Sequence, residues 1–271
     1  MKTETIPTRW CEAKETLARR FSNAVQLLVA CDYDGTLSPI VSRPTDAVLA
    51  RGAIEVLRDL LALPGIRLAI VSGRSLDDLA ARVPLPDVIL VGNHGLETRG
   101  LGLDSEVSAA AAQRGELGSL MESVTLELQT IPGILIESKG LTASVHYRNT
   151  PPTHFSRIAE TLNRLVTDTR GFDLHHGKMV WEVKPQVSWH KGTALRFILE
   201  RFGLSDSMAL FLGDDATDEF VFDSLPSAIT VFVGPLRATK ARWRADDPDD
   251  VVRFLDWLAR ARRECTRLEK S

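Results

Sequence analysis

Two aspartates stand two residues apart in the segment Asp32-Tyr33-Asp34-Gly35-Thr36-Leu37, which directly follows an apolar run. Carboxylates at this spacing could share the work of phosphoryl transfer. One, as an anion, could attack phosphorus and form an aspartyl-phosphate, and the other could protonate the leaving oxygen and then deprotonate a water. Gly35 permits the tight, close-approach turn that a nucleophile needs behind it. Without its neighbours, the pair fits an ordinary polar turn after a strand equally well.

A second acidic cluster follows the apolar run 208–212. Its acidic side chains are Asp214, Asp215, Asp218 and Glu219, four within six residues. Such carboxylates repel one another unless a cation lies among them, and Mg²⁺ prefers hard oxygen ligands of this kind. We expect Asp32 and Asp214, each at the end of a strand, to share one magnesium ion. The alternative, an acidic first turn of a helix, could account for Asp218 and Glu219.

Two further segments could hold a phosphate. Ser72-Gly73-Arg74 ends an apolar run ahead of a helical pattern, where a hydroxyl and backbone N–H groups can bind phosphate oxygens. Lys191, at the start of another helical pattern, could neutralise the charge of a phosphoryl group in transfer. Each feature alone is typical of a turn or of a surface lysine. Their joint occurrence, each at a junction between strand and helix, is what indicates a phosphate site.

Apolar strand-like runs alternate with helical patterns towards both ends of the chain. The expected strands cover 26–31, 67–72, 88–91, 208–212 and 229–233, and the expected helices cover 46–63, 191–202, 217–224 and 248–263, with one more opened by Ser75. This alternation predicts βαβ units on a parallel sheet, an α/β fold. Because ligands gather at the carboxyl ends of parallel strands, both acidic clusters should lie at that edge of the sheet.

The middle of the chain has a different pattern. After a helical stretch at 106–129, three runs alternate apolar and polar residues as half-buried strands do, and a helix at 152–168 separates the second run from the third. Their polar faces carry Glu137 and Lys139, His146 and Arg148, and Glu182 and Lys184. We predict an inserted α+β domain over 99–186, within a core formed by 1–98 and 187–271. Its charged face is either a solvated surface or a binding face for a molecule rich in hydroxyls.

Together these motifs resemble those of the haloacid dehalogenase superfamily of phosphohydrolases. DYDGTL is similar to the first motif of that superfamily, Ser72 to the second, Lys191 to the third and GDDATDE to the fourth. The resemblance implies a Rossmann-like core, an inserted cap and Mg²⁺ as cofactor. It also implies the roles of single residues: Asp32 as nucleophile; Asp34 as acid and base; Asp32, the Asp34 backbone carbonyl and Asp214 as metal ligands; Ser72, Gly73 and Lys191 as phosphate contacts; and Asp215 and Asp218 as supports of the metal ligands.

Six longer segments indicate which family of this superfamily the chain resembles. VSGR at 71–74, GNHGLE at 92–97, ESKG at 137–140, VHYRN at 145–149, KMVWEVKP at 178–185 and FLGDDATDE at 211–219 are similar to the trehalose-6-phosphate phosphatase family. This resemblance implies hydrolysis of trehalose 6-phosphate to trehalose and phosphate. The substrate contacts that it implies are Tyr33, Arg74, Asn93, His94, Glu137, Lys139, His146, Arg148, Glu182 and Lys184. Asn93 and Leu96 depart from the residues that many members have around this His-Gly pair.

Three other functions stay open at this stage. A phosphatase of the same superfamily could act on another sugar phosphate, such as sucrose phosphate or mannosyl-phosphoglycerate, and the inserted domain would decide between them. A phosphorylated receiver domain also has a phospho-accepting aspartate on a doubly wound sheet, but the Asp32–Asp34 pair and the inserted domain argue against it. A non-catalytic sugar-phosphate-binding module would have no need of both Asp32 and Asp34.

The composition indicates the cellular compartment and excludes some kinds of partner. With 33 Lys and Arg against 36 Asp and Glu, the net charge is −3, which argues against a nucleic-acid-binding protein. No apolar run reaches the length of a membrane span, and the first residues show no apolar core of a secretory signal. Three scattered cysteines fit a reducing compartment. We therefore expect a cytoplasmic enzyme, monomeric, with a small-molecule substrate and neither nucleic acid nor membrane as partner.

Overall fold

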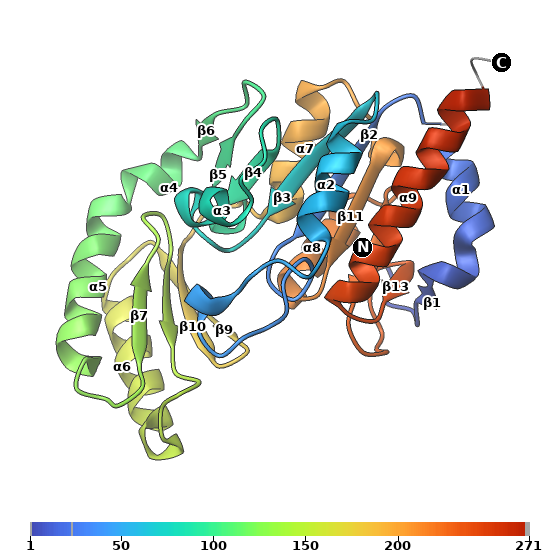
Figure 1. The fold of residues 1–271 in the computed structure, drawn as a ribbon. Helices are drawn as coiled ribbons and strands as arrows, with labels where there is room; N and C mark the ends of the chain where they lie inside the picture. Colours follow the sequence, from blue (N-terminus) through green and yellow to red (C-terminus); the bar gives the residue numbers. More distant parts are fainter. Residues whose placement is uncertain (1, 23, 269–271) are drawn as a thin grey trace. The chain divides into compact units, whose positions relative to one another are not determined.

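The computed structural model describes residues 2–22 and 24–268, which form two compact units (Figure 1). The larger unit contains the described residues up to Ser105 and from Trp189 onward, and the smaller unit is Glu106–Ser188. The sequence prediction puts these boundaries at 98/99 and 186/187. The first boundary lies later because strand β5 (Glu97–Arg99) pairs antiparallel with β4 (Ile89–Gly92) and so extends the sheet of the larger unit.

A nine-stranded sheet runs through the larger unit in the order β1-β13-β12-β11-β2-β3-β4-β5-β6. Its other strands are β1 (Thr8–Arg9), β2 (Leu27–Asp32), β3 (Ile66–Val71), β6 (Ser105–Glu106), β11 (Ala209–Gly213), β12 (Ile229–Val233) and β13 (Trp243–Ala245). From β1 to β4 along this order, all neighbours pair in parallel. Every residue of β2 and β11 is buried, so each of the two acidic motifs stands at the end of a fully buried strand.

Helices cover both faces of this sheet (Figure 1). One face packs against α1 (Lys14–Ser22), α2 (Ala53–Leu61), α3 (Leu76–Arg82) and α9 (Pro248–Leu268), and the other packs against α7 (Lys191–Arg201) and α8 (Glu219–Ser224). Alternate residues of β2 enter the two cores, with Val29 and Cys31 on the first face and Leu28 and Ala30 on the second. Burial of apolar surface on both faces therefore holds the strand ends in place.

The α/β fold is confirmed. The first and last residues of each of the five predicted core strands differ by at most one position from those of an observed strand. The predicted helix 46–63 is shorter than expected. Residues Pro44–Asp46 form a 3₁₀ turn, and α2 begins only after Gly52, whose φ of 83° lies in the left-handed region and interrupts a helix. The short strands β1, β5, β6 and β13 are not predicted, because two or three residues are too few to show a period.

The smaller unit contains a four-stranded antiparallel sheet in the order β7-β8-β10-β9. Its elements are α4 (Ser108–Ala112), α5 (Arg114–Leu128), β7 (Leu135–Ser138), β8 (Ala143–His146), α6 (Phe155–Asp168), β9 (Phe172–Gly177) and β10 (Val180–Pro185). One face of the sheet packs on α5 and α6 through a core that includes Val145, Ile158 and Val183. The sequence analysis does not predict β9, because His175 and His176 conceal the alternation of Phe172 and Leu174.

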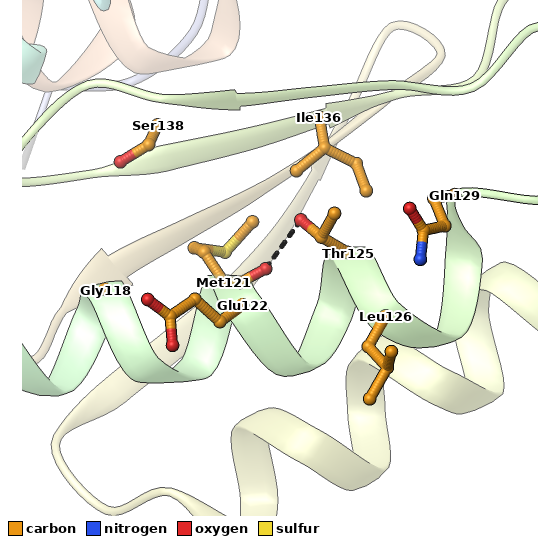
Figure 2. A pocket seen from close by; sticks show the side chains of 8 residues that line it. All are labelled: Gly118, Met121, Glu122, Thr125, Leu126, Gln129, Ile136 and Ser138. Atoms are coloured by element: carbon orange, nitrogen blue, oxygen red, sulfur yellow. Dashed lines mark hydrogen bonds between the residues drawn. The ribbon is translucent and has the colours of Figure 1, made fainter.

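A pocket of about 440 Å³ lies between α5 and β7 of the smaller unit (Figure 2). It is lined by Gly118, Met121, Glu122, Thr125, Leu126, Gln129, Ile136 and Ser138. Because side chains alternate along a strand, Ile136 and Ser138 face this pocket while Glu137 faces the opposite side of the sheet. The pocket therefore contains none of the predicted substrate contacts. Over residues 2–22 and 24–268, no helix is both long and apolar enough to cross a bilayer.

Candidate active site

Asp32 and Lys191 form a buried ion pair at the carboxyl end of β2. Lys191 Nζ donates to Asp32 Oδ1 at 2.7 Å and to Asp218 Oδ1 at 2.8 Å, and none of the three side chains is more than 6% exposed. Burial raises the pKa of Asp32, while the Lys191 ammonium opposes that rise. Burial would lower the pKa of Lys191, but Asp218 and Asp32 raise it above its ordinary value. The lysine is therefore a fixed cation directed at the predicted nucleophile.

The turn after β11 places the second acidic motif. Asp218 Oδ2 accepts a hydrogen bond from the Asp215 N–H at 3.0 Å, and Asp215 Oδ1 accepts one from the Ala216 N–H at 2.6 Å. The first of these bonds, together with one from the Asp218 backbone N–H to the Asp215 side chain, forms a capping box at the 3₁₀ turn Ala216–Asp218. Asp215 therefore shapes the turn, and Asp218 connects the turn to Lys191. Their role as supports of the metal ligands stays a prediction.

Glycines allow the two acidic motifs to approach each other. A Cβ atom on Gly35, whose φ is 85°, would lie 2.3 Å from Oδ2 of Asp214. A Cβ atom on Gly213 would lie 2.4 Å from Cγ of Asp218. Because real Cβ atoms do not come this close, both positions require glycine. The glycine that follows the first aspartate pair thus makes room for the carboxylate of the second motif.

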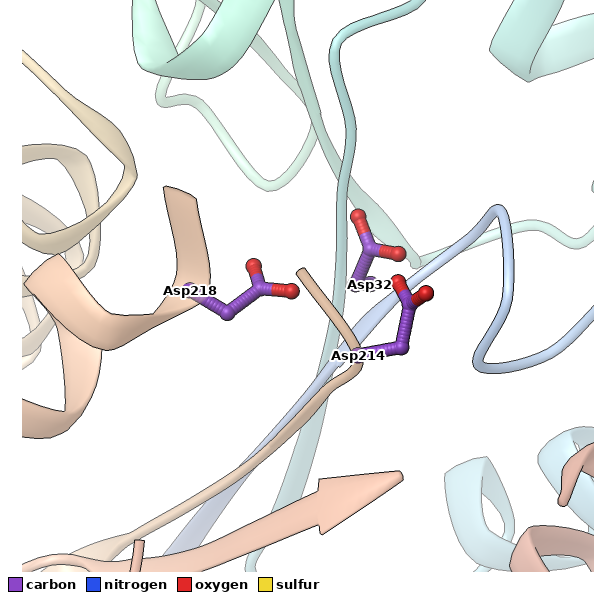
Figure 3. Close-up of side chains that lie close together, drawn as sticks. All are labelled: Asp32, Asp214 and Asp218. Atoms are coloured by element: carbon purple, nitrogen blue, oxygen red, sulfur yellow. The ribbon is translucent and has the colours of Figure 1, made fainter. Parts of the chain in front are cut away.

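Three carboxylates converge at this point, as Figure 3 shows. Asp32, Asp214 and Asp218 each offer an oxygen, and these oxygens lie within 4.8 Å of one another. Carboxylate oxygens are hard ligands that suit Mg²⁺, and the Asp214 carboxylate fills the cradle over Gly35. Asp218 is bonded through one oxygen to Lys191 and through the other to a backbone N–H. The donor set thus fits a divalent cation, and the assignment of Asp32 and Asp214 as its ligands stays a prediction.

Asp34 is held by Arg74. Arg74 Nε donates to Asp34 Oδ2 and Arg74 Nη2 donates to Asp34 Oδ1, both at 2.7 Å. The pair spans two neighbouring strands, since Asp32 is in register with Val71 in the parallel pairing of β2 and β3. Asp34 lies two residues after the end of β2, and Arg74 lies three residues after the end of β3. The Asp34 carboxylate, 37% exposed, is bound to Arg74 and is not one of the group of three carboxylates.

The loops after β3 and β4 bond to each other and gather five predicted site residues. The His94 N–H donates to the Ser72 carbonyl at 2.9 Å, and the Asn93 N–H donates to the Arg74 carbonyl at 2.7 Å. Asn93 and His94 both have φ in the left-handed region, 46° and 59°, which places the His94 ring against Gly73. A Cβ atom on Gly73 would lie 2.5 Å from Cε1 of His94. The predicted phosphate contacts Ser72 and Gly73 therefore adjoin the predicted sugar contacts Asn93 and His94.

Tyr33 is a core residue. Its side chain has no exposed surface and packs with Val29 and Cys31 in the core on the α2 side of the sheet. The Arg74 guanidinium lies 5.2 Å from the centre of its ring. This corrects the prediction of a sugar contact from the Tyr33 side chain, because a fully enclosed ring cannot reach a substrate. The signal was present in the sequence: Val29, Cys31 and Tyr33 alternate and so share one face.

The predicted contacts of the smaller unit gather on one face of its sheet. Glu137 pairs with Ser144 across β7 and β8, and Ser144 pairs with Glu182 across β8 and β10. The charged groups bond within this face: His146 Nε2 lies 3.0 Å and Lys139 Nζ 3.9 Å from Glu137 Oε2, and Lys184 Nζ lies 2.7 Å from Glu182 Oε2. At the end of β8, Arg148 donates to the Lys178 carbonyl at 3.0 Å. Their role as substrate contacts stays a prediction.

Two residues that the sequence analysis did not select support the site. Asp78 accepts a hydrogen bond from Arg74 Nη1 at 2.6 Å, so it holds the partner of Asp34. His190 is the N-cap of α7, and its Nδ1 accepts from the N–H groups of Gly192 and Thr193 at 3.1 and 3.3 Å. It precedes Lys191 directly. The sequence predicts only a helix opened by Ser75, within which Asp78 lies; the pairing of Asp78 with Arg74 depends on the tertiary structure.

Comparison with known proteins decides the family. A family model described as Trehalose-phosphatase matches residues 30–249, most of the chain. The chain belongs to the trehalose-phosphatase family. The resemblance read from the sequence motifs is thereby confirmed, and the matched range contains all the predicted site residues.

Relatives in this family come from distant organisms. A trehalose-phosphate phosphatase of Mycobacterium tuberculosis is 37% identical over 250 residues, covering 89% of this chain and 63% of the relative. Trehalose-phosphate phosphatase B of Arabidopsis thaliana is 31% identical over 256 residues, covering 88% of this chain and 68% of the relative. The chain thus spans less than two thirds of the mycobacterial relative. The structure of a C. albicans trehalose-6-phosphate phosphatase C-terminal domain has the same fold, with a TM-score of 0.78, 24% identity, and coverage of 94% of this chain and 98% of that one.

Proposed function

We propose that the chain is a Mg²⁺-dependent phosphatase that hydrolyses trehalose 6-phosphate to trehalose and inorganic phosphate. The observation that carries the proposal is the buried arrangement of Asp32, Lys191 and the acidic turn after β11, in a chain of the trehalose-phosphatase family. Relatives at 37% and 31% identity carry the name trehalose-phosphate phosphatase. We propose further that it acts as a monomer in the cytoplasm, where the exposed thiol of Cys11 stays reduced.

The chemistry proceeds in two displacements at phosphorus. In the first, an oxygen of Asp32 forms a bond to phosphorus, the bond to the sugar oxygen breaks, and Asp34 gives that oxygen a proton. In the second, Asp34 takes a proton from water, the water oxygen attacks phosphorus, and Asp32 leaves as a carboxylate. Lys191 holds the Asp32 carboxylate in one orientation throughout and balances charge on the transferring group.

Asp32, Asp214 and the Asp34 backbone carbonyl are the groups that would hold the magnesium ion. When bound, the ion neutralises negative charge on the phosphate and on the converging carboxylates. Burial raises the pKa of Asp32, and the neighbouring carboxylates of Asp218 and Asp214 raise it further, so a cation bound among them would stabilise the ionised carboxylates. Ser72, 1% exposed, and Gly73 contribute a hydroxyl and a backbone N–H to the phosphate site.

The smaller unit supplies recognition of the disaccharide in this proposal. Its polar sheet face offers carboxylates as acceptors (Glu137, Glu182) and cations as donors (Lys139, Arg148, Lys184), which suits a ligand that consists mainly of hydroxyl groups. The mutual ion pairs orient these side chains before substrate binds, so less conformational entropy is lost on binding.

Release of phosphate tests the proposal directly. The purified chain is incubated with trehalose 6-phosphate, sucrose 6-phosphate, mannosyl-phosphoglycerate and glucose 6-phosphate, each with Mg²⁺ and with EDTA. We expect rapid release from trehalose 6-phosphate, slow release from the others, and loss of activity in EDTA that added Mg²⁺ restores. Faster release from another sugar phosphate would contradict the substrate, and full activity in EDTA would contradict the metal.

A further inference from the structure

Arg74 makes four hydrogen bonds to the protein through its guanidinium group, which has five N–H donors. Its Nε and Nη2 donate to the two oxygens of Asp34 at 2.7 Å, Nη2 also donates to the Pro44 carbonyl at 2.9 Å, and Nη1 donates to Asp78 at 2.6 Å. Its side chain is only 7% exposed. Each of its three guanidinium nitrogen atoms is thus directed at the protein.

Asp78 binds the guanidinium nitrogen of Arg74 that does not contact Asp34. It lies in the first turn of α3, where its backbone N–H is capped by Ser75 Oγ at 3.3 Å. Its carboxylate also accepts from Arg82 Nε at 3.0 Å. Burial alone would raise the pKa of Asp78, but the hydrogen bonds from Arg82 and Arg74 lower it below its ordinary value. Charges of alternating sign therefore run from Asp34 through Arg74 and Asp78 to Arg82.

The bidentate contact with Arg74 restrains the Asp34 carboxylate but leaves some of its lone pairs unoccupied. A carboxylate has about four lone-pair sites, and Arg74 takes one on each oxygen. The remaining lone-pair sites stay available to take up the proton that Asp34 exchanges with the sugar oxygen and with water. The planar guanidinium also fixes the plane of the carboxylate, which a single hydrogen bond cannot do. Asp34 is 37% exposed, so other restraint on its rotation is weak.

We propose that Arg74 is the positioning residue for Asp34, and that Asp78 holds Arg74 in that role. The proposal rests on the proposed function, in which Asp34 is the acid and base. It differs from the role implied by the family resemblance, in which Arg74 contacts the substrate. Arg74 acts through Asp34 on proton transfer and leaves the binding of substrate unchanged.

Steady-state kinetics separate these two roles. For Arg74→Gln we expect kcat to fall about 100-fold, the effect of misplacing a catalytic group by about 1 Å, with KM within twofold of the wild type. Arg74→Lys keeps the charge but loses the fork and should recover only part of that loss. Asp78→Asn should lower kcat severalfold. The matched control is Asp77→Asn: Asp77 neighbours Asp78 in α3, is 90% exposed and pairs with Arg99, so its replacement should change neither constant.

A single-turnover experiment removes the objection that the variants are merely misfolded. Transfer from trehalose 6-phosphate needs a proton for the sugar oxygen, whereas transfer from p-nitrophenyl phosphate has a good leaving group and needs little help. Arg74→Gln should therefore slow the first transfer at least tenfold more than the second. Equal slowing of both transfers, or a raised KM with unchanged kcat, would overturn the proposal. Wild-type turnover of trehalose 6-phosphate tests the proposed function itself; if another phosphate ester is the substrate, the same ratios are measured with that ester.

Discussion

The two units hold their charges in different ways. In the larger unit, Lys191 and its two carboxylate partners are at most 6% exposed. Lys191 opens helix α7, Asp32 ends a buried parallel strand, and Asp218 lies in a capped turn. In the smaller unit, Glu137 is 33% and His146 21% exposed, on alternate positions of antiparallel strands. Charges that stabilise a transition state must be fixed and shielded from water, whereas groups that bind hydroxyls must be reachable. The difference agrees with a division into chemistry and recognition.

The largest expected effect comes from the buried side of this comparison. Asp32→Asn keeps the shape of the side chain but removes the nucleophilic charge and one metal ligand. Turnover should fall about a thousandfold or more, as for other nucleophile replacements. It should fall equally for trehalose 6-phosphate and for a small aryl phosphate, measured by phosphate release.

Trapping of the intermediate checks the same variant. Acid-quenched wild type should carry a base-labile phosphoryl group after brief exposure to substrate, and Asp32→Asn should carry none. If the variant kept more than a few per cent of wild-type activity on either substrate, a covalent route through Asp32 would be untenable.

Asp34→Asn should have the next largest effect. The amide can neither give nor take the proton, so kcat should fall about 10²- to 10⁴-fold. Because Asp34 is outside the group of three carboxylates, binding of magnesium and of trehalose 6-phosphate should persist in calorimetry. Loss of binding together with turnover would show that Asp34 maintains the structure of the site and has no separate part in proton transfer.

Sequence reasoning located the residues of the larger site better than their contacts. Asp32, Lys191 and Asp214 could be predicted because each directly follows or opens a regular element, and parallel strands bring such ends together. The Asp34–Arg74 pair could not, since it depends on the register of β2 against β3 across 40 residues of chain. Tyr33 was predicted as a substrate contact from the resemblance alone, whereas its alternation with Cys31 indicates the core position that its side chain occupies. In the smaller unit, period-2 alternation placed the charges on one face, but their ion pairs require the strand register.

Replacement of charges in the smaller unit should separate binding from chemistry. Glu182→Ala or Arg148→Ala removes one charged hydrogen-bonding group, worth about 1.5–3 kcal/mol, so kcat/KM for trehalose 6-phosphate should fall roughly 10- to 150-fold. Activity on a small aryl phosphate should hardly change. Lys191→Ala should instead lower both activities together, because the phosphate is common to both substrates.

A control for these variants lies on the helix side of the same unit. Arg164 of α6 pairs with Glu127 at the surface, and its side chain is 52% exposed, so Arg164→Ala should change neither activity. If Glu182→Ala behaved in the same way, the polar face would be solvated surface only. If it lowered both activities equally, the smaller unit would act through the stability of the enzyme and the recognition role would be wrong.

The smallest expected effect tests how the larger unit holds Lys191. Neutral His190 caps α7 through Nδ1, and burial, together with Arg196, lowers its pKa below the ordinary value of 6.5; its ring also stacks on Phe220. A lowered pKa in the folded state means that the cap contributes fully above pH 6.5 and is lost as the pH falls, since the unfolded chain binds the proton more readily. Asn is an equally good N-cap and does not titrate.

His190→Asn should therefore have the same free energy of unfolding as the wild type at pH 8. At pH 5 the free energy of unfolding of the variant should be higher by about 1 kcal/mol or less, which is the contribution of one N-cap. Urea unfolding at the two pH values measures the difference, with Asp77→Asn as the reference variant. A difference that did not depend on pH would show that His190 contributes through packing on Phe220 and not as a titrating cap.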